Sequence, residues 1–334
     1  MNAPVDATLA SGQSLGQSLM RTEDATLLTG SAQFGDDLPV RGNTLYAAIL
    51  RSPHAHAEIL SIDTTAALKR PGVAAVLIGR EVKAETEPFL VGVKAPIDDW
   101  ALAVDRVRYV GEPVALVVAS DRYKAEDALD AIEVLYKPLP VAVDPDLAMR
   151  EDAPLLYPAC QSNVVHDREF CYGDPKAAFA NAPRKVSIEV EYPRILCAPM
   201  EGYVVTADYN QAEDSYDVMA NFQGPFSVLT VVPRALRVPA NRFRLRTPPS
   251  SGGSFGSKLA IFPYMVLISL ASKRAGRPVK WVEDRMEHLA ASGSGPWRRT
   301  LIEAAVSEQG EILGLQCDHI EEYGAVLRAP MPGA

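Results

Sequence analysis

The sequence predicts an α+β protein, a mixture of helices and strands in two successive domains, and three observations support this fold class. Of its 334 residues, 48% are apolar and 22% are charged, which is typical of globular proteins with a full hydrophobic core. Short apolar runs of strand length alternate with helical spacing up to about residue 143. After a proline-rich stretch, the pattern changes to the period-two alternation of half-buried strands.

The first 20 residues are expected to form a flexible arm, because they are small and polar without a sustained hydrophobic period. They lack the basic segment and apolar run of a secretory signal, and no stretch reaches the ~18 consecutive apolar residues of a membrane span. A net charge of −9 disfavours binding to nucleic acid, which requires basic surface. We therefore expect a cytoplasmic protein that contacts neither membranes nor nucleic acid.

Three buried strands are predicted in the first domain, over residues 45–50, 73–78 and 113–119. Each is a short apolar run, and the first two follow clear turn residues. Ser120 or Asp121 then caps a helix whose apolar side chains recur at helical spacing. A strand followed by an amphipathic helix is the usual local pattern of an α/β domain.

The best domain boundary lies in the seven-proline stretch from Pro138 to Pro183, because proline interrupts long helices and central strands. We therefore expect a first domain over residues 21–143, a linker over 144–183 and a second domain over 184–334.

The second domain is expected to open with strands and to contain two helices and a final hairpin. Period-two alternation predicts strands near residues 186–192, 203–209 and 242–246. Pro225 opens a helix that runs through Leu236 and that Pro233 kinks or shortens. The remaining predicted elements are a glycine-rich loop over 251–257, an apolar helix over 258–274 ended by Gly276, and a hairpin of strands 301–306 and 312–320.

The glycine-rich loop is the strongest local signal of a binding site. Glycines let a backbone approach a ligand closely, and a following helix offers free N–H groups to oxyanions. The loop is not a Walker motif, because Ser257 separates Gly256 from Lys258 and Leu259 replaces the required hydroxyl residue. It also lacks the spacing of the dinucleotide fingerprint. A tight turn that packs a helix onto a sheet stays open as the alternative.

Other candidate residues carry weaker signals. His54 and His56 lie two apart, but without a third ligand we favour structural hydrogen bonds over a metal site. Four cysteines without a CxxC pair predict free thiols rather than a zinc or iron–sulfur site. Glu201 lies among apolar neighbours, where a carboxylate is either paired or functional. Gln223 has the same character, as a polar residue at a strand end.

A series of segments along the chain carries a more specific signal than any one of them. The amino-terminal segments are Arg21–Asp24, Leu28–Gly30, Phe34–Leu38, Leu45–Ala57, Pro71–Val73, Val110–Ala115 and Ala125–Ala128. The later ones are Gly173–Asp174, Pro199–Glu201, the strand end at Gln223 and Gly252–Gly256. In this order they resemble the molybdenum-binding large subunit of the xanthine dehydrogenase, aldehyde oxidase and carbon monoxide dehydrogenase family of molybdenum hydroxylases. The first set is similar to its hammerhead domain and the second to the start of its cofactor-binding domain.

The resemblance implies hydroxylation with water-derived oxygen at a molybdenum held by a pterin dithiolene, without a protein ligand to the metal. The pterin is expected as molybdopterin or as its cytosine dinucleotide. By position, Gln223 is similar to the family's glutamine that hydrogen-bonds the apical oxo group of the metal. The resemblance assigns cofactor binding to five loop residues, Gly252, Gly253, Ser254, Phe255 and Gly256.

The sequence departs from the family pattern in three respects. Leu259 stands where purine-oxidising relatives have a substrate-binding glutamate, which argues against a purine pocket. Ser254 and Ser257 replace glycines common in the motif. The chain stops at Ala334, before the family's later pterin loops and its carboxy-terminal catalytic glutamate.

We therefore expect the amino-terminal half of a split subunit, inactive alone and completed by a second chain that carries the general base. The resemblance also implies an iron–sulfur subunit with 2Fe–2S clusters and an FAD subunit as partners. N-heteroaromatic compounds and aldehydes are the expected substrates. Carbon monoxide is disfavoured, because the glycine-rich loop lacks the cysteine that the resemblance associates with this substrate. A truncated chain and a noncatalytic assembly or scaffolding protein stay open as alternatives.

Overall fold

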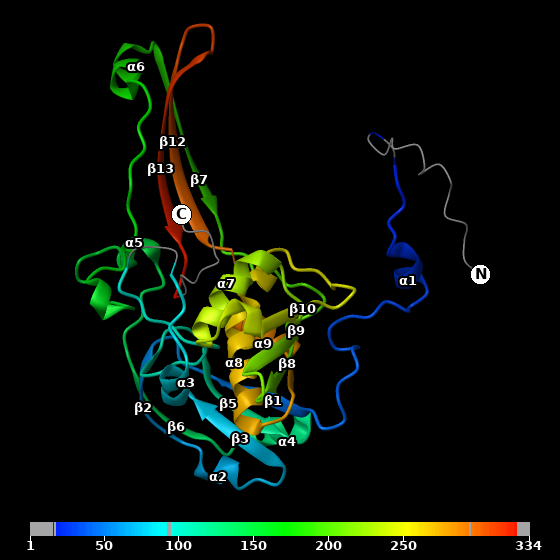
Figure 1. Cartoon of the computed structure of the whole chain (residues 1–334). Coiled ribbons are helices and arrows are strands. Elements are labelled where there is room, and N and C mark those ends of the chain that lie inside the picture. Colours follow the sequence, from blue (N-terminus) through cyan, green and yellow to red (C-terminus); the bar gives the residue numbers. More distant parts are fainter. Residues whose placement is uncertain (1–15, 17, 92–94, 294, 326–334) are drawn as a thin grey trace.

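The computed structural model of this chain describes residue 16 and residues 18–91, 95–293 and 295–325, and these form a mixture of helices and strands as predicted (Figure 1). Most of the predicted amino-terminal arm lies outside the described residues. The helices are α1 (Asp24–Leu28), α2 (Thr65–Leu68), α3 (Gly79–Glu85), α4 (Arg122–Leu129), α5 (Pro145–Ala148), α6 (Pro175–Asn181), α7 (Pro225–Ala235), α8 (Phe262–Ala275) and α9 (Arg285–Ala291). No helix among the described residues is both long enough and apolar enough to cross a bilayer.

A seven-stranded sheet forms the body of the molecule, in the order β10-β9-β8-β11-β1-β5-β3. Its strands are β1 (Leu45–Arg51), β3 (Val73–Ile78), β5 (Pro113–Ala119), β8 (Val204–Asn210), β9 (Ser215–Ala220), β10 (Phe243–Arg246) and β11 (Val279–Val282). Strands β1 and β11 meet in parallel, with Leu45 opposite Val279. The sheet therefore joins strands from before and after the proline-rich stretch.

Strand β5 shows why an unbroken apolar run forms the centre of this sheet. Leu116 and Val118 belong to the large core that includes α8, whereas Val117 and Ala119 belong to a smaller core that includes α4. All seven residues of the strand are buried because both faces of the sheet are covered. The cap of α4 is Asp121, whose side chain accepts a hydrogen bond from the backbone N–H of Lys124.

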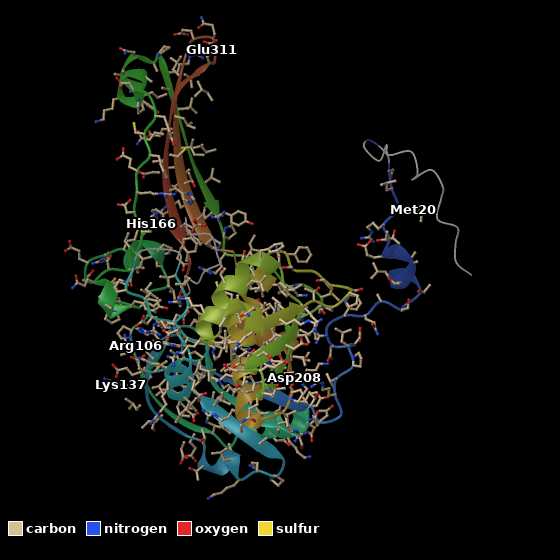
Figure 2. The ribbon with its side chains drawn as sticks, in the orientation of Figure 1. Met20, Arg106, Lys137, His166, Asp208 and Glu311 are labelled. Atoms are coloured by element: carbon tan, nitrogen blue, oxygen red, sulfur yellow. The ribbon has the colours of Figure 1, made fainter. Side chains whose placement is uncertain are left out.

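Two three-stranded sheets complete the fold. One has the order β4-β2-β6, formed by β4 (Arg106–Val107), β2 (Ala57–Asp63) and β6 (Glu133–Pro138). The other has the order β13-β12-β7, formed by β13 (Ile312–Glu322), β12 (Trp297–Val306) and β7 (Arg184–Tyr192). The second sheet extends away from the body in Figure 1, and Glu311 lies at its far tip in Figure 2. The predicted hairpin is therefore present, with longer strands than expected.

The two helices predicted in the second domain are present, one of them with a shifted start. Helix α7 begins at Pro225 and contains Pro233. The apolar helix predicted from residue 258 begins as a 3₁₀ turn over Ser257–Ile261, and α8 continues from Phe262. Gly276 follows α8 with a φ of 63°, the left-handed conformation that commonly ends a helix.

Candidate functional site

The glycine-rich loop connects β10 to the turn that precedes α8, and its glycines are required by its geometry. A Cβ atom on Gly252 would lie 2.4 Å from the Cβ of Glu201, closer than any side chain tolerates. Gly253 and Gly256 have φ angles of 96° and 97°, which side chains disfavour. Glycine therefore permits both a close approach at the start of the loop and a left-handed turn at its end.

Phe255 is the most unusual residue of the loop, because its φ of 52° is rare for a bulky side chain. Such a backbone conformation costs of order 1–3 kcal/mol and clusters at ligand and active sites. The aromatic ring is nevertheless 76% exposed. Met200, beside Glu201, and Phe226, three residues after Gln223, are two further large apolar residues, 89% and 84% exposed. The loop thus presents apolar surface and backbone strain together.

The structure brings Gln223 to the loop although it lies 31 residues before Ser254 in the chain. The Ser254 hydroxyl donates a hydrogen bond to Oε1 of Gln223 at 2.5 Å. The same hydroxyl oxygen accepts from the backbone N–H of Lys258 at 3.2 Å, and the backbone N–H of Gln223 donates to the Lys258 carbonyl at 3.4 Å. Ser254 thus orients the amide group of Gln223.

Several hydrogen-bond donors in this loop have no acceptor among the described residues. Within the described residues, no hydrogen bond engages the Nε2 amide of Gln223 or the backbone N–H groups of Gly253, Ser254, Phe255 and Gly256. Successive N–H groups in a turn with left-handed residues form a concavity that favours electron-rich oxygen atoms. The donors therefore fit a bound group with an oxo or other electron-rich oxygen atom, and the exposed Phe255 ring offers it apolar contact.

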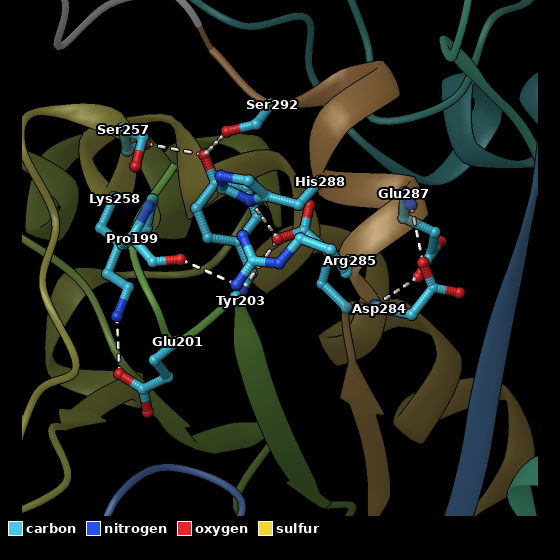
Figure 3. A network of polar contacts seen from close by, with 12 residues as sticks. Pro199, Glu201, Tyr203, Ser257, Lys258, Asp284, Arg285, Glu287, His288 and Ser292 are labelled. Carbon is cyan, nitrogen blue, oxygen red and sulfur yellow. Dashed lines mark hydrogen bonds and ion pairs between the residues drawn. The ribbon is translucent and has the colours of Figure 1, made fainter. Parts of the chain in front are cut away.

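Glu201 is paired, which is one of the two outcomes expected for a carboxylate among apolar neighbours. Its carboxylate accepts a hydrogen bond from Lys258 Nζ at 2.6 Å (Figure 3). It also accepts from the Gly252 N–H at 2.9 Å and the Gly35 N–H at 3.0 Å. Burial raises the pKa of Glu201, but these hydrogen bonds outweigh it and hold the pKa below its ordinary value. The carboxylate is therefore ionised and fully engaged.

A second network of hydrogen bonds contacts the loop at Ser257. Tyr203 donates from its hydroxyl to the Ser257 carbonyl at 2.7 Å and from its backbone N–H to Glu283 Oε2 at 2.9 Å. His288 Nδ1 lies 2.7 Å from the same Glu283 oxygen, and both side chains are fully buried. The hydrogen bond to Glu283 raises the pKa of His288. Arg285 donates to the carbonyls of Pro199 and Met200, at 2.8 Å each.

Sequence reasoning missed this second network. Its local signal was available, because Asp284 and Glu287 form a capping box at the start of α9 and mark where that helix begins. The spacing of Glu283 and His288 along the chain contains no sign that the two are buried together. The burial of this pair follows from tertiary packing, in which both side chains contact Tyr203, just before β8.

The two histidines of the segment before β2 make separate contacts within the fold. His56 Nδ1 lies 2.8 Å from the Pro140 carbonyl, and His54 packs edge-on against Tyr136. The described residues contain no group of three or more potential metal ligands. All four cysteines are free thiols, as the sequence predicts.

Comparison with known proteins places these features in a family. Residues 156–332 match the family model of the molybdopterin cofactor-binding domain, and residues 29–140 match the a/b hammerhead domain of aldehyde oxidase and xanthine dehydrogenase. Among curated proteins, the nicotine 6-hydroxylase large subunit of Paenarthrobacter nicotinovorans is 36% identical over 95% of this chain and 39% of its own length. The carbon monoxide dehydrogenase large chain of Hydrogenophaga pseudoflava is 35% identical over 97% of this chain and 42% of its own length.

A solved structure agrees with these matches. The quinoline 2-oxidoreductase of Pseudomonas putida 86 aligns with a TM-score of 0.86 and 32% identity, covering 95% of this chain and 40% of that one. The chain thus spans about 40% of the length of these relatives. The predicted order of a hammerhead domain followed by a molybdenum-cofactor-binding domain is confirmed. Because the cofactor-binding model alone covers more than half of its residues, this chain belongs to the molybdenum hydroxylase family of xanthine dehydrogenases and aldehyde oxidases.

Proposed function

We propose that this chain forms one side of the molybdopterin site of a hydroxylase that oxidises an N-heteroaromatic or aldehyde substrate with oxygen from water. The observation that carries the proposal is a single loop that holds the Gln223 amide through Ser254, contains four backbone N–H groups that no described residue engages, and includes Phe255 at a positive φ. Nicotine and quinoline, in the names of two relatives, are N-heteroaromatic compounds, which favours this substrate class.

Each residue has a distinct part in this proposal. The bound molybdenum–pterin group, as molybdopterin or its cytosine dinucleotide, supplies two-electron redox chemistry and activates water. Gln223 donates a hydrogen bond from its amide to an oxygen of that group. The N–H groups of residues 253–256 add fixed dipoles that stabilise negative charge there, the physical basis of an oxyanion hole. The Phe255 ring covers the bound group and excludes water.

The general base of the reaction is proposed to lie outside these residues. A general base needs a pKa near the working pH and a free lone pair. Glu201 is the carboxylate that contacts the loop through Gly252, and its oxygens are engaged by Lys258 and two backbone N–H groups that lower its pKa. It is therefore unsuited to accept a proton from substrate or water.

The missing base and further pterin contacts are proposed to come from a second chain, which corresponds to the remaining length of the relatives. Exposed apolar surface supports such a partner. On one face of the projecting sheet, Val186, Ile188 and Val190 of β7 are between 47% and 57% exposed. Apolar side chains grouped in this way mark interaction surfaces more often than free surface. We propose that an iron–sulfur subunit with 2Fe–2S clusters and an FAD subunit complete the complex and carry electrons away.

The proposal is tested on the complex purified from its native source through a tag on this chain. Metal and pterin analysis should find molybdenum and pterin, and the chain expressed alone should lack substrate oxidation. A complex free of both molybdenum and pterin would contradict the proposal and favour a scaffolding role. Oxidation by this chain alone, after reconstitution with cofactor, would exclude the need for a second chain.

Gln223→Ala tests the catalytic role directly. Loss of one preorganised donor lowers turnover by about 10²–10³ at comparable sites, and we expect this loss per bound molybdenum at unchanged cofactor content. Gln211→Ala, which changes an exposed glutamine in the β8–β9 turn, is the matched control and should keep full turnover. If Gln223→Ala instead lowers melting temperature and cofactor content at unchanged turnover per molybdenum, Gln223 is a structural residue.

A further inference from the structure

Glu201 joins three segments that are distant in the sequence. Its Oε1 accepts from the Gly35 N–H, in the segment that precedes β1, and its Oε2 accepts from Gly252 and Lys258, at the two ends of the glycine-rich loop. The backbone N–H of Glu201 donates to the Gly252 carbonyl at 3.3 Å. A single residue therefore holds both ends of the loop and connects them to the amino-terminal part of the chain.

The pair that Glu201 forms with Lys258 is costly to build. The Lys258 side chain is 1% exposed and that of Glu201 13%, so both charges have lost most of their hydration. Buried ion pairs contribute little net stability, because the loss of hydration cancels most of the attraction, and apolar residues of similar volume often stabilise a fold as well or better. In some proteins such pairs are retained for the definite geometry that the charges and hydrogen bonds impose.

That geometry is imposed on the part of the loop that carries the strain. The four residues 253–256 lie between the anchors at Gly252 and Lys258, and they include Phe255 at a φ of 52° and Gly256 at a φ of 97°. Gly252 has no Cβ, and this absence lets Glu201 approach its backbone. A strained conformation persists only where its surroundings hold it, and the two anchors supply such restraint.

We propose that Glu201 and Lys258 are positioning residues, which hold residues 252–258 in the conformation that receives the molybdenum–pterin group. The inference rests on the proposed function for the identity of that group. The loop conformation itself depends only on contacts within this chain. Removal of either charge removes a contact that holds the loop, and residues 253–256 then leave the backbone conformation that the structure shows.

Hydrogen exchange on the full chain without cofactor tests the conformational part. The amides of Ser257 and Leu259 donate to the carbonyls of Ser254 and Gly256, and Glu201 does not accept from either, so they report loop shape rather than loss of a direct contact. In Glu201→Gln and in Lys258→Met we expect these amides to exchange about tenfold faster. The double variant Glu201→Gln/Lys258→Met leaves no unpaired buried charge, and it should show the same acceleration.

Glu287→Gln is the matched control, because it removes another buried ion pair that does not contact the loop. Its partner is Arg51, and the two side chains are 17% and 10% exposed. We expect exchange at Ser257 and Leu259 to stay within about twofold of the unmodified chain. The positioning role would be overturned if these amides exchanged as fast in Glu287→Gln as in the loop variants at the same melting temperature. Unchanged exchange rates in Glu201→Gln, Lys258→Met and the double variant would also overturn it.

Molybdenum content of the purified complex tests the link to the cofactor. We expect Glu201→Gln and Lys258→Met to retain less than about a tenth of the molybdenum per chain, and Glu287→Gln to retain it fully. If the unmodified complex holds no molybdenum while the exchange results are as expected, the proposed function fails and the loop role stands. If the variants bind molybdenum normally, the positioning role fails and the proposed function stands.

Discussion

The buried pair of Glu283 and His288 beneath the loop leads to a quantitative prediction. Both side chains are fully buried, and Oε2 of Glu283 receives hydrogen bonds from His288 and from the Tyr203 N–H, whereas Oε1 has no partner among the described residues. His288→Leu keeps much of the volume but leaves the Glu283 carboxylate buried without a counter-charge. Breaking a buried ion pair in this way costs ~3–5 kcal/mol of unfolding free energy. At roughly 2 °C per kcal/mol for a large domain, the melting temperature should fall by roughly 6–10 °C.

The pH dependence follows from the raised pKa of His288. Because the folded pKa lies above the unfolded value of about 6.5, the pair stabilises the fold fully below that pH. The stabilisation is lost as the pH rises through the folded pKa. The difference in stability between the unmodified chain and His288→Leu should therefore be largest near pH 6 and shrink at alkaline pH.

Urea unfolding followed by tryptophan fluorescence measures these free energies, because one of the three tryptophans, Trp281, is buried and stacked on Tyr264. Glu283→Gln/His288→Leu is the informative control, since the neutral amide still accepts from the Tyr203 N–H and no charge remains unpaired. This double variant should recover more than half of the stability that His288→Leu loses. A loss below about 1 kcal/mol in His288→Leu, or a double variant as unstable as the single one, would refute the assignment of a buried ion pair.

Two further predictions concern local geometry. Gly252→Ala should lower the unfolding free energy by about 1–3 kcal/mol, because its Cβ would lie 2.4 Å from that of Glu201, whereas Gly42→Ala, with open space around it, should stay within about 0.5 kcal/mol. Equal melting temperatures for these two alanine variants would contradict the close approach. Asp121→Ala should cost about 1 kcal/mol by removing the acceptor for the Lys124 N–H at the start of α4, and Asp121→Asn should restore most of it in the same melting assay. Failure of asparagine to restore stability would show that the carboxylate charge, rather than the cap, matters.

Local patterns predicted about half of the helices and strands among the described residues, because each of these depends on residues that are close together in the chain. The apolar run at residues 113–119 predicts a buried strand, and it forms β5 at the centre of the sheet. The glycine at position 276 predicts the end of α8, and in the structure it is left-handed. Asp121 predicts the start of α4. The series of short motifs, taken in order, was enough to predict both domains of the family. The roles of Gln223 and the loop residues stay predictions until the variants are measured.

The tertiary structure alone decided which distant segments meet. The sequence marked Glu201 as a carboxylate that needs a partner, but Lys258 is 57 residues away and Gly35 is 166 residues away. The meeting of β1 with β11, which merges the two halves of the chain into one sheet, also left no local pattern. Strand and helix preferences act over a few residues, whereas strand neighbours and buried pairs are selected by how the whole chain packs its apolar surface. The sequence by itself therefore determined the family and many of the central strands and helices, whereas packing determined the neighbours of the strands and the contacts that hold the loop.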